Sequence, residues 1–350
     1  MFRWTTLIAI AAMLALAGCS EDRSEGGGGG GGSEPAAGSD NVVRFTFAPD
    51  PVWRWLKDQG IKDEMEQEAK IQILDSSTWD EFGIYAGGHA DVVSVGSFEV
   101  PELEKQTGVK SVIFGRYNIA RAVIAVRKDS PYQTLSDLKG KKITTFTAVS
   151  DALLWGSMVK KSEGIDFKAD DGDFEFVLTD VQNMASLVAK GDAEACVCLP
   201  DFAIKELKSG DLRILYDGQS DGEKFQADIV NDHPGPAINV FVAREDWFKE
   251  HPKEAEFFLE VWERGIKEWN THREEIIAAY PQDFAAQNKD DEQWIGNYLD
   301  DHNWFMDSVY LDDEWIEGEN KVFDLLKETG FMEQEQEPPP FETVGAPAAR

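Results

Sequence analysis

Short apolar runs alternate with amphipathic stretches along the first half of the chain. Residues 42–47, 70–74 and 90–96 are short and rich in apolar and β-branched side chains, which is typical of buried strands. The stretches at 51–60, which begins with proline, and 78–88, which closes on two glycines, have the pattern of helices. Because strands and helices alternate, the sequence predicts a largely parallel sheet with helices on its faces.

The same alternation begins again after residue 120. A β-branched run at 121–130 is followed by further strand and helix patterns as far as residue 217, which make a second α/β unit of similar size. A strand pattern at 234–246 follows a Pro-Gly break, and residues 247–328 are nearly all helical in pattern. We therefore predict an α/β protein of two lobes with a helical C-terminal region.

Composition supports a folded protein and limits its partners. Hydrophobic residues make up 42% of the 350 residues, enough for two cores, whereas the ends at 20–40 and 333–350 have little to bury. The 34 basic and 66 acidic residues give a formal net charge of −32, which excludes nucleic acid as a partner because its binding needs a basic surface. The acidic residues are dispersed, so we interpret them as the solvated surface of an acidic protein rather than as a site.

The first residues have the layout of a secretory signal peptide. A start with one basic residue precedes an apolar run at 7–17, which is too short to span a bilayer, and small residues precede Cys19. The tetrad Leu16-Ala17-Gly18-Cys19 resembles the bacterial lipobox, which implies cleavage before Cys19 and its lipidation. The alternative is an ordinary signal peptide with a chance cysteine. The Gly- and Ser-rich segment behind Cys19 favours the lipoprotein, since a coil of about 20 residues spans roughly 25 Å and would leash a folded unit to a membrane.

Two more cysteines, Cys196 and Cys198, lie in an apolar strand pattern. Residues two apart on a strand share a face, so this pair has the spacing to bind a metal or to form a bridge. Because so short a bridge would be strained, we predict two buried thiols. Three cysteines in total exclude a fold held together by disulfides, and we predict no metal site and no cofactor.

Three stretches resemble the type II periplasmic binding fold, in which a second lobe is inserted into the first. They carry Gly-x-x-Asp-apolar at 87–97, Leu-x-Asp-Leu-Lys-Gly-Lys-x-apolar within 126–143, and Leu-x-x-x-Gly-x-x-x-Ala-x-x-x-x-Pro within 187–202. The strand and long helix at 240–269 resemble the nitrate, sulfonate, taurine and bicarbonate group of this fold. The resemblance implies a solute-binding lipoprotein that feeds an ABC importer.

That resemblance sets the expected organisation and partners. The expected divisions are a signal peptide at 1–18, a flexible tether at 19–41, the first part of lobe one at 42–117, lobe two at 118–236, a return to lobe one with the C-terminal helices at 237–332, and a disordered tail at 333–350. A hinge is expected near 117–118 and 236–239. The expected partners are a small-molecule solute, a permease and, through the lipid alone, a membrane. We expect a monomer in the periplasm or on the outer face of the cell membrane.

The ligand site is expected where the strands end. In open parallel sheets, ligands bind beyond the carboxyl ends of the strands, where helix N-termini offer free N–H groups, and in a two-lobe protein both such edges face one cleft. We therefore predict these ligand-binding residues: from lobe one Asp50, Trp53, Ser76, Ser77, Thr78, Trp79 and Ser97, and from lobe two Thr147, Ser150, Trp155, Asp180 and Asp201.

Several of these residues have an alternative role. A ring of Trp53 or Trp79 at the mouth suits ligand stacking, with core filling as the alternative. Five residues are reasonable helix N-caps: Ser77, Thr78, Ser97, Ser150 and Asp201. The nature of the solute is also open. The family resemblance favours a sulfonate or taurine-like anion, whereas Trp beside Asp better suits a neutral or cationic nitrogen compound.

Two other classes of function share these features. The fold also resembles some enzymes of pyrimidine and thiamine metabolism, but no nucleophile–histidine spacing and no metal or phosphate motif stands out, so we predict no catalytic residue and no enzyme. A ligand-sensing lipoprotein of a signalling system would show the same sequence features. A transport assay with and without the protein separates it from an importer component.

Overall fold

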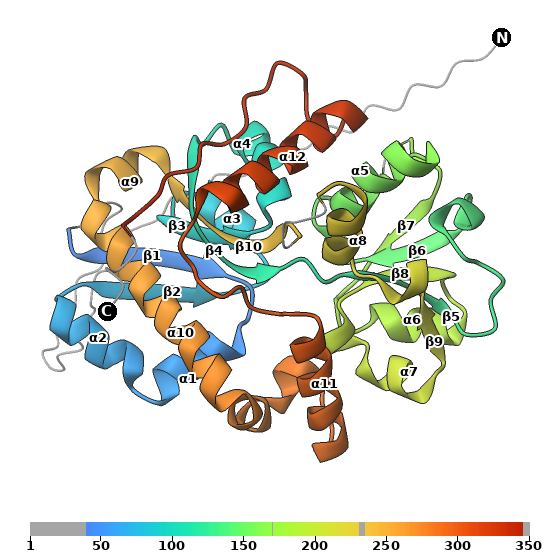
Figure 1. The fold of residues 1–350 in the computed structure, drawn as a ribbon, viewed down its shortest axis with the longest axis horizontal. Coiled ribbons are helices and arrows are strands. Elements are labelled where there is room, and N and C mark those ends of the chain that lie inside the picture. The colour runs from blue at the N-terminus through green and yellow to red at the C-terminus, as the bar shows by residue number, and fades with distance from the viewer. Residues whose placement is uncertain (1–39, 170, 231–234, 346–350) are drawn as a thin grey trace, which may run out of the picture. The chain divides into compact units, whose positions relative to one another are not determined.

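Two five-stranded sheets organise the molecule (Figure 1). The computed structural model describes residues 40–169, 171–230 and 235–345. The predicted signal peptide, Cys19 and nearly all of the predicted tether lie outside the described residues.

The first sheet has the strand order β2-β1-β3-β10-β4. β1 pairs in parallel with β2 and β3, whereas β10 runs antiparallel between β3 and β4. We call this sheet and the helices packed on it lobe one. Its strands are β1 (Val42–Phe47), β2 (Gln72–Ser77), β3 (Val92–Val95), β4 (Ser111–Ile119) and β10 (Ala237–Arg244).

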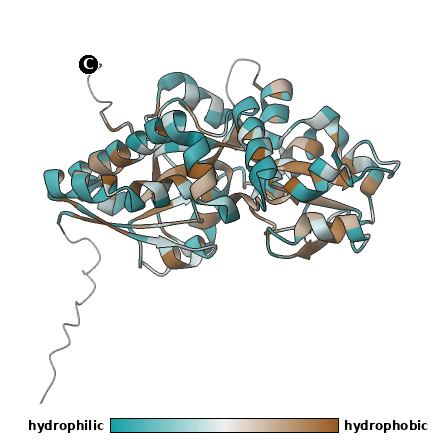
Figure 2. Ribbon diagram, turned by 90° about the horizontal axis from the view of Figure 1, so that it is seen from below, coloured by the Kyte–Doolittle hydropathy of each residue, from teal (hydrophilic) through white to brown (hydrophobic). Residues whose placement is uncertain are grey.

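Neighbouring side chains of lobe one belong to separate cores on the two faces of its sheet. Val92 lies in one apolar cluster with α1 and α10, and Val93 lies in another with α3 and α4. Figure 2 shows the same division, with brown apolar segments inside and teal hydrophilic residues prominent on the outer helices. The helices of lobe one are α1 (Pro51–Asp58), α2 (Ile61–Ala69), α3 (Glu81–Ala86), α4 (Val100–Thr107), α9 (Glu245–Glu250) and α10 (Pro252–Ala279), with the 3-10 helix η1 (Ser97–Glu99) before α4.

The second sheet repeats this plan in the order β7-β6-β8-β5-β9. β6 is parallel to β7 and β8, and β5 is antiparallel to β8 and β9. We call this sheet and its helices lobe two. Its elements are β5 (Val123–Arg127), η2 (Leu135–Leu138), β6 (Lys142–Thr145), α5 (Asp151–Glu163), β7 (Glu175–Leu178), α6 (Met184–Lys190), β8 (Ala195–Cys198), η3 (Pro200–Phe202), α7 (Ile204–Ser209), β9 (Leu212–Ile214), η4 (Tyr216–Gly218) and α8 (Asp221–Asp228).

The chain passes between the sheets twice. It leaves β4 at Ile119 and enters β5 at Val123, and it returns from lobe two before β10 begins at Ala237. The predicted hinge at these places and the predicted domain boundaries stay predictions.

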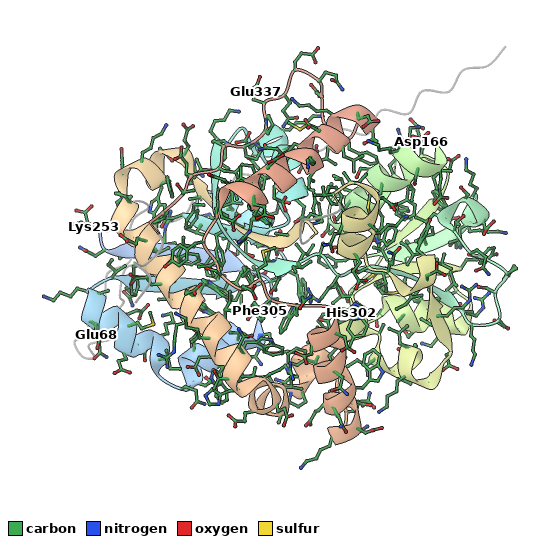
Figure 3. All side chains as sticks on the ribbon, in the orientation of Figure 1. Glu68, Asp166, Lys253, His302, Phe305 and Glu337 are labelled. Atoms are coloured by element: carbon green, nitrogen blue, oxygen red, sulfur yellow. A yellow bond between two sulfur atoms is a disulfide. The ribbon has the colours of Figure 1, made fainter. Side chains whose placement is uncertain are left out.

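The C-terminal helices pack against lobe two. They are joined to it by ion pairs of Lys208 with Asp291 and of Lys161 with Glu328, both at 2.7 Å, and by His302 with Glu223 at 2.6 Å. Figure 3 labels His302 just after the end of α11, on the side that faces lobe two. The helices after α10 are η5 (Pro281–Phe284), α11 (Lys289–Asp301) and α12 (Asp313–Thr329).

The end of the chain is placed against lobe one, so the predicted disorder is wrong for residues 333–345. β4 is an edge strand, and its Ile113 donates a backbone hydrogen bond to Pro340 and accepts one from Glu342. The ring of Phe341 lies 5.7 Å from that of Trp315 and 5.9 Å from that of Phe323. An edge strand offers unpaired backbone groups, and this segment uses them although its composition is polar. Residues 346–350 lie outside the described chain.

Cys196 and Cys198 are joined by a disulfide in β8, so the prediction of two thiols is wrong. Both residues are buried. Their side chains share one face of the strand and their Cα atoms lie 5.3 Å apart, within the usual range for a disulfide.

No helix in residues 40–169, 171–230 or 235–345 is both long enough and apolar enough to cross a bilayer.

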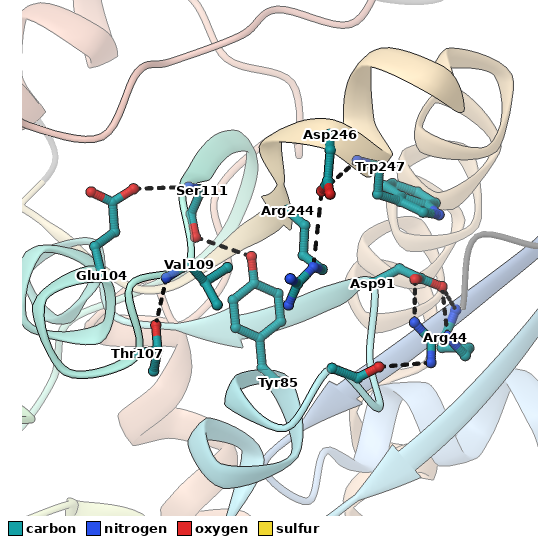
Figure 4. Close-up of polar contacts among 11 residues, drawn as sticks. Arg44, Tyr85, Asp91, Glu104, Thr107, Val109, Ser111, Arg244, Asp246 and Trp247 are labelled. Atoms are coloured by element: carbon teal, nitrogen blue, oxygen red, sulfur yellow. Dashed lines mark hydrogen bonds and ion pairs between the residues drawn. The ribbon is translucent and has the colours of Figure 1, made fainter. Parts of the chain in front are cut away.

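A buried ion pair explains the Gly-x-x-Asp motif ahead of β3 (Figure 4). Asp91 accepts hydrogen bonds from the backbone N–H, Nε and Nη2 of Arg44 in β1, the last at 2.6 Å. Arg44 Nη1 donates to the carbonyl of Gly88 at 2.9 Å. Gly88 has a φ of +75°, a conformation that favours glycine, so the motif shapes the turn that presents both acceptors. The side chain of Asp91 is only 3% exposed.

Replacing Asp91 by Ala should therefore destabilise the protein without changing ligand binding. The change leaves the guanidinium of Arg44 buried without its partner, which should lower the free energy of unfolding by about 3 kcal/mol. Chemical denaturation measures the loss. The control is Glu175→Ala, which removes the exposed ion pair to Lys142 and should cost less than about 1 kcal/mol. Equal losses in the two variants would contradict this account.

Candidate ligand-binding site

A cavity lies where the carboxyl ends of strands from both lobes meet. Its space is about 970 Å³, open mouth included. Lobe one contributes the segments after β1, β2 and β3, lobe two those after β6 and β8, and the two crossing segments contribute the floor. The polar and aromatic lining residues are Asp50, Trp79, Glu81, Ser94, Glu99, Tyr117, Asn118, Arg121, Phe146, Thr147, Ser150, Asp151, Asp201, Phe202, Asn239, Asp283, Phe284 and Trp304.

The one arginine of this lining is already paired. Arg121, on the segment between β4 and β5, donates from Nε at 3.3 Å and from Nη2 at 3.0 Å to the two carboxylate oxygens of Asp201. Its guanidinium also lies 5.4 Å from the centre of the Trp304 ring. Its charge is therefore largely neutralised on the protein side of the cavity.

Four lining carboxyl groups have no such partner. Asp50, Glu81, Glu99 and Asp151 form no ion pair with any Lys, Arg or His in the described chain. Burial raises the pKa of Asp50 to about 6, of Glu81 to about 7 and of Glu99 to about 8. These groups therefore resist ionisation in the empty cavity, although the charge of Arg121 partly opposes the shift at Asp50.

A fifth carboxyl group lies directly behind Asp151. Asp221 is fully buried, and burial together with the charge of Asp151 raises its pKa well above the ordinary range. The pKa of Asp151 is also raised, by burial. Both carboxyl groups therefore resist ionisation in the empty cavity.

Aromatic rings from both lobes meet at the mouth. The ring of Trp79, between β2 and α3, lies 5.3 Å from that of Phe146 and 6.2 Å from that of Phe202, both in lobe two. Trp79 is 39% exposed, which is unusual for a large apolar residue of this molecule. The contacts bring the two lobes together directly over the cavity.

Solved structures with very different sequences share this architecture. The periplasmic aliphatic sulphonate binding protein SsuA from Escherichia coli has a TM-score of 0.65 at 16% identity, over 89% of this chain and 96% of its own. The alkanesulfonate-binding protein SsuA from Xanthomonas axonopodis pv. citri, bound to MOPS, has a TM-score of 0.64 at 15% identity, over 85% and 96%. A Candida albicans protein with the generic periplasmic binding protein fold has a TM-score of 0.61 at 11% identity, over 88% and 98%.

The chain has the periplasmic binding protein fold. The predicted fold class, two α/β lobes with a helical C-terminal region, is confirmed. Residues 84–227 also match the family model described as ABC transporter, phosphonate, periplasmic substrate-binding protein. The resemblance to periplasmic binding proteins of ABC transporters is thus confirmed. A comparison with curated protein sequences finds no match.

Within this periplasmic binding fold, the structure brings five of the twelve predicted site residues to the cavity: Asp50, Trp79, Thr147, Ser150 and Asp201. Their contact with a ligand stays a prediction. Asp50 also caps α1, since its carboxylate accepts hydrogen bonds from the backbone N–H of Val52 and Trp53. Ser150, by contrast, precedes α5 without capping it through its side chain.

Trp53 lies in the core of lobe one, so its predicted place in the cleft is wrong. It is 1% exposed and stacks on Trp262 of α10 at 5.1 Å. Val52, Trp53 and Leu56 form the buried face of α1, and this helical spacing is the signal that would have identified Trp53 as a core residue.

The other six predicted residues also lie away from the cavity lining. Trp155 is buried, stacks on Tyr216 at 5.2 Å and donates from its indole N–H to the carbonyl of Ala122. Ser97 is buried below the lining. The remaining four lie at the ends of β2 and β7 or just after them, outside the cavity lining: Ser76, Ser77, Thr78 and Asp180.

Acidic lining residues that are absent from the predicted ligand-binding residues include Glu81, Glu99 and Asp151. Glu81 and Asp151 are the first residues of α3 and α5, and Glu99 ends η1. A search for acidic residues in the first turn after each strand would have found them. Arg121 carries no comparable signal, because only the crossing of the chain brings it to the cavity.

We predict that Trp79→Ala weakens ligand binding and leaves the fold stable. Loss of an aromatic anchor at the mouth should cost about 2 kcal/mol of binding free energy, or roughly thirty-fold in affinity. The matched control is Trp53→Ala, which should lower the free energy of unfolding by about 3 to 5 kcal/mol because it empties a core position. Titration by intrinsic fluorescence and thermal denaturation measure the two effects. A Trp79→Ala variant that binds like the parent would remove the aromatic mouth from the site.

The raised pKa of Glu99 predicts how the free energy of unfolding of the ligand-free protein depends on pH. Its pKa of about 8 in the folded state exceeds the ordinary value of 4.5, so between these values the folded chain holds a proton that the unfolded chain has lost. This group therefore makes the free energy of unfolding fall as the pH rises from about 4.5 to 8. Glu99→Gln should reduce that slope, as measured by urea denaturation at pH 5, 6, 7 and 8. The exposed Glu64→Gln is the control, and parallel curves for Glu99→Gln and the parent would contradict the assignment.

Proposed function

We propose that this protein captures a small organic solute in the cavity between its lobes and delivers it to an ABC importer. The observation that carries the proposal is the cavity lined by strand ends of both lobes and by both crossing segments. Such a site is completed only when two lobes face each other, which suits capture by closure around a ligand. The match of residues 84–227 to a periplasmic substrate-binding family supports the same role.

The lining gives no support to an enzyme. Among the described residues that line the cavity there is no His, Cys or Lys, and the serines there have no histidine beside them. A nucleophile with an adjacent base is the minimum for covalent catalysis of the kind considered for the fold-related enzymes. A binding protein, in contrast, needs only shape, charge and closure.

We expect one solute molecule per chain and no chemical change in it. Native mass spectrometry of protein purified under mild conditions should show a single adduct, and the released compound should be identical before and after long incubation. Loss of uptake in cells that lack the protein, with recovery on its return, separates an importer component from a sensor. Turnover of the released compound would contradict the proposal.

We also propose that the protein is a lipoprotein. The support is the sequence Leu16-Ala17-Gly18-Cys19 and the Gly- and Ser-rich spacer that follows, both outside the described residues. A spacer of about 20 residues leaves the lobes free to turn near the permease.

Cys19→Ala should move the protein from the membrane fraction to the soluble fraction. The substitution removes the sulfur that would carry the lipid, and Cys19 is remote in sequence from both lobes, so the melting temperature should not change. Fractionation followed by immunodetection measures the distribution. Ser20→Ala is the control and should stay with the membrane. A Cys19→Ala variant that still pellets with membranes would contradict the anchor.

A further inference from the structure

We propose that the solute is an organic cation, a protonated or quaternary amine with an apolar body. This inference rests on the proposed function, since it names the chemical class that the same cavity accepts. It differs from the sulfonates named for two of the structural neighbours.

The ionisable side chains that line the cavity are mostly acidic. Four carboxyl groups that form no ion pair line it from four different segments: Asp50 after β1, Glu81 after β2, Glu99 after β3 and Asp151 after β6. Arg121 is engaged by both oxygens of Asp201, so the lining offers no cation to an anionic ligand. A cationic ligand would supply the charge that these carboxyl groups lack.

Backbone N–H groups at the starts of helices hold anions in many proteins. On lobe one, acidic side chains already accept hydrogen bonds from such groups. Asp50 accepts from the N–H groups of Val52 and Trp53 at the start of α1, and Glu99 accepts from the N–H of Gly96 beside η1. An oxyanion at these positions would meet carboxylate oxygens in place of free donors.

One buried hydrogen-bond acceptor of the lining, the side-chain oxygen of Asn118, has no donor. Asn118 lines the cavity, is only 3% exposed and donates from Nδ2 to Asn239 at 3.1 Å, but its Oδ1 has no hydrogen-bond partner among the described residues. Glu81 Oε2 and Asp151 Oδ1 are also buried and have no hydrogen-bond partner among the described residues. The described lining also has a buried donor without a hydrogen-bond partner, Trp304 Nε1, but the three acceptors outnumber it and favour a ligand that donates hydrogen bonds or carries positive charge.

The remaining features indicate an organic cation rather than a metal ion. Aromatic faces suit a cation with an apolar body. At the mouth, the ring of Trp79 lies 5.3 Å from that of Phe146 and 6.2 Å from that of Phe202. Within the described chain, no group of three His, Cys, Asp or Glu side chains is close enough to hold a metal.

The test compares matched pairs of probes that differ in charge and not in shape. The full-length protein is freed of any retained solute by reversible unfolding and titrated calorimetrically. The pairs are choline with 3,3-dimethylbutan-1-ol, benzylamine with benzyl alcohol, and butane-1,4-diamine with butane-1,4-diol. Butane-1-sulfonate and methylphosphonate are the anions. We expect at least one cation to bind tenfold or more tightly than its neutral partner and than either anion.

Two variants then locate the charge. Glu81→Gln and Glu99→Gln should each weaken binding of that cation tenfold or more, with melting temperatures recorded to confirm folding. Glu64→Gln makes the same change on the exposed surface of α2 and should leave the affinity within twofold. If neither cavity variant loses affinity although both are folded, the inference is overturned.

The outcomes separate the inference from the proposed function. If a neutral probe or an anion binds as tightly as any cation, the cation class is overturned and solute capture stands. If no probe binds but native mass spectrometry shows a retained solute, a compound without a basic or quaternary nitrogen overturns the inference, and one with it supports it. If no probe binds and no solute is retained, both the inference and the proposed function fail.

Discussion

Each sheet depends on an antiparallel strand, and the two such strands lie next to the passages between the lobes. β10 joins β3 to β4 in the first sheet, and β5 joins β8 to β9 in the second. Because β10 arrives only after the whole of lobe two, the first sheet is completed by a part of the chain remote in sequence. The same connection turns the carboxyl ends of the parallel strands in both lobes toward one cavity. The place of the site is thus a consequence of how the chain returns.

Desolvation is the main energetic feature of that cavity. Carboxyl groups at helix starts are favourable by themselves, since they satisfy free N–H groups and the helix dipole. Several of them at one enclosed place are costly, because each loses water and none gains a cation. The raised pKa values of Asp50, Glu81 and Glu99 express that cost. Function and stability therefore oppose each other here, and a ligand of the right charge would relieve the conflict.

Apolar contacts continue from one lobe to the other, and ion pairs add to them. One apolar cluster includes Val93 of lobe one, Trp155 of lobe two and Phe323 of α12. The C-terminal helices also meet lobe two through ion pairs such as Lys208 with Asp291 and Lys161 with Glu328. Exposed ion pairs contribute little free energy each. Rings around Trp79 add contacts at the mouth of the cavity.

The sequence by itself determined the alternation of strands and helices, the two lobes and the helical end, because these depend on local periodicity. It also contained the Gly-x-x-Asp motif and the strand ends at which Asp50, Trp79, Thr147, Ser150 and Asp201 line the cavity. Only the tertiary structure decided the rest. The two strand ends at β2 and β7 left Ser76, Ser77, Thr78 and Asp180 outside the lining, although Trp79 and Glu81 after β2 belong to it. The free edge of β4 bound the polar end of the chain. These outcomes depend on which segments become neighbours in space, and no local pattern of side chains records that.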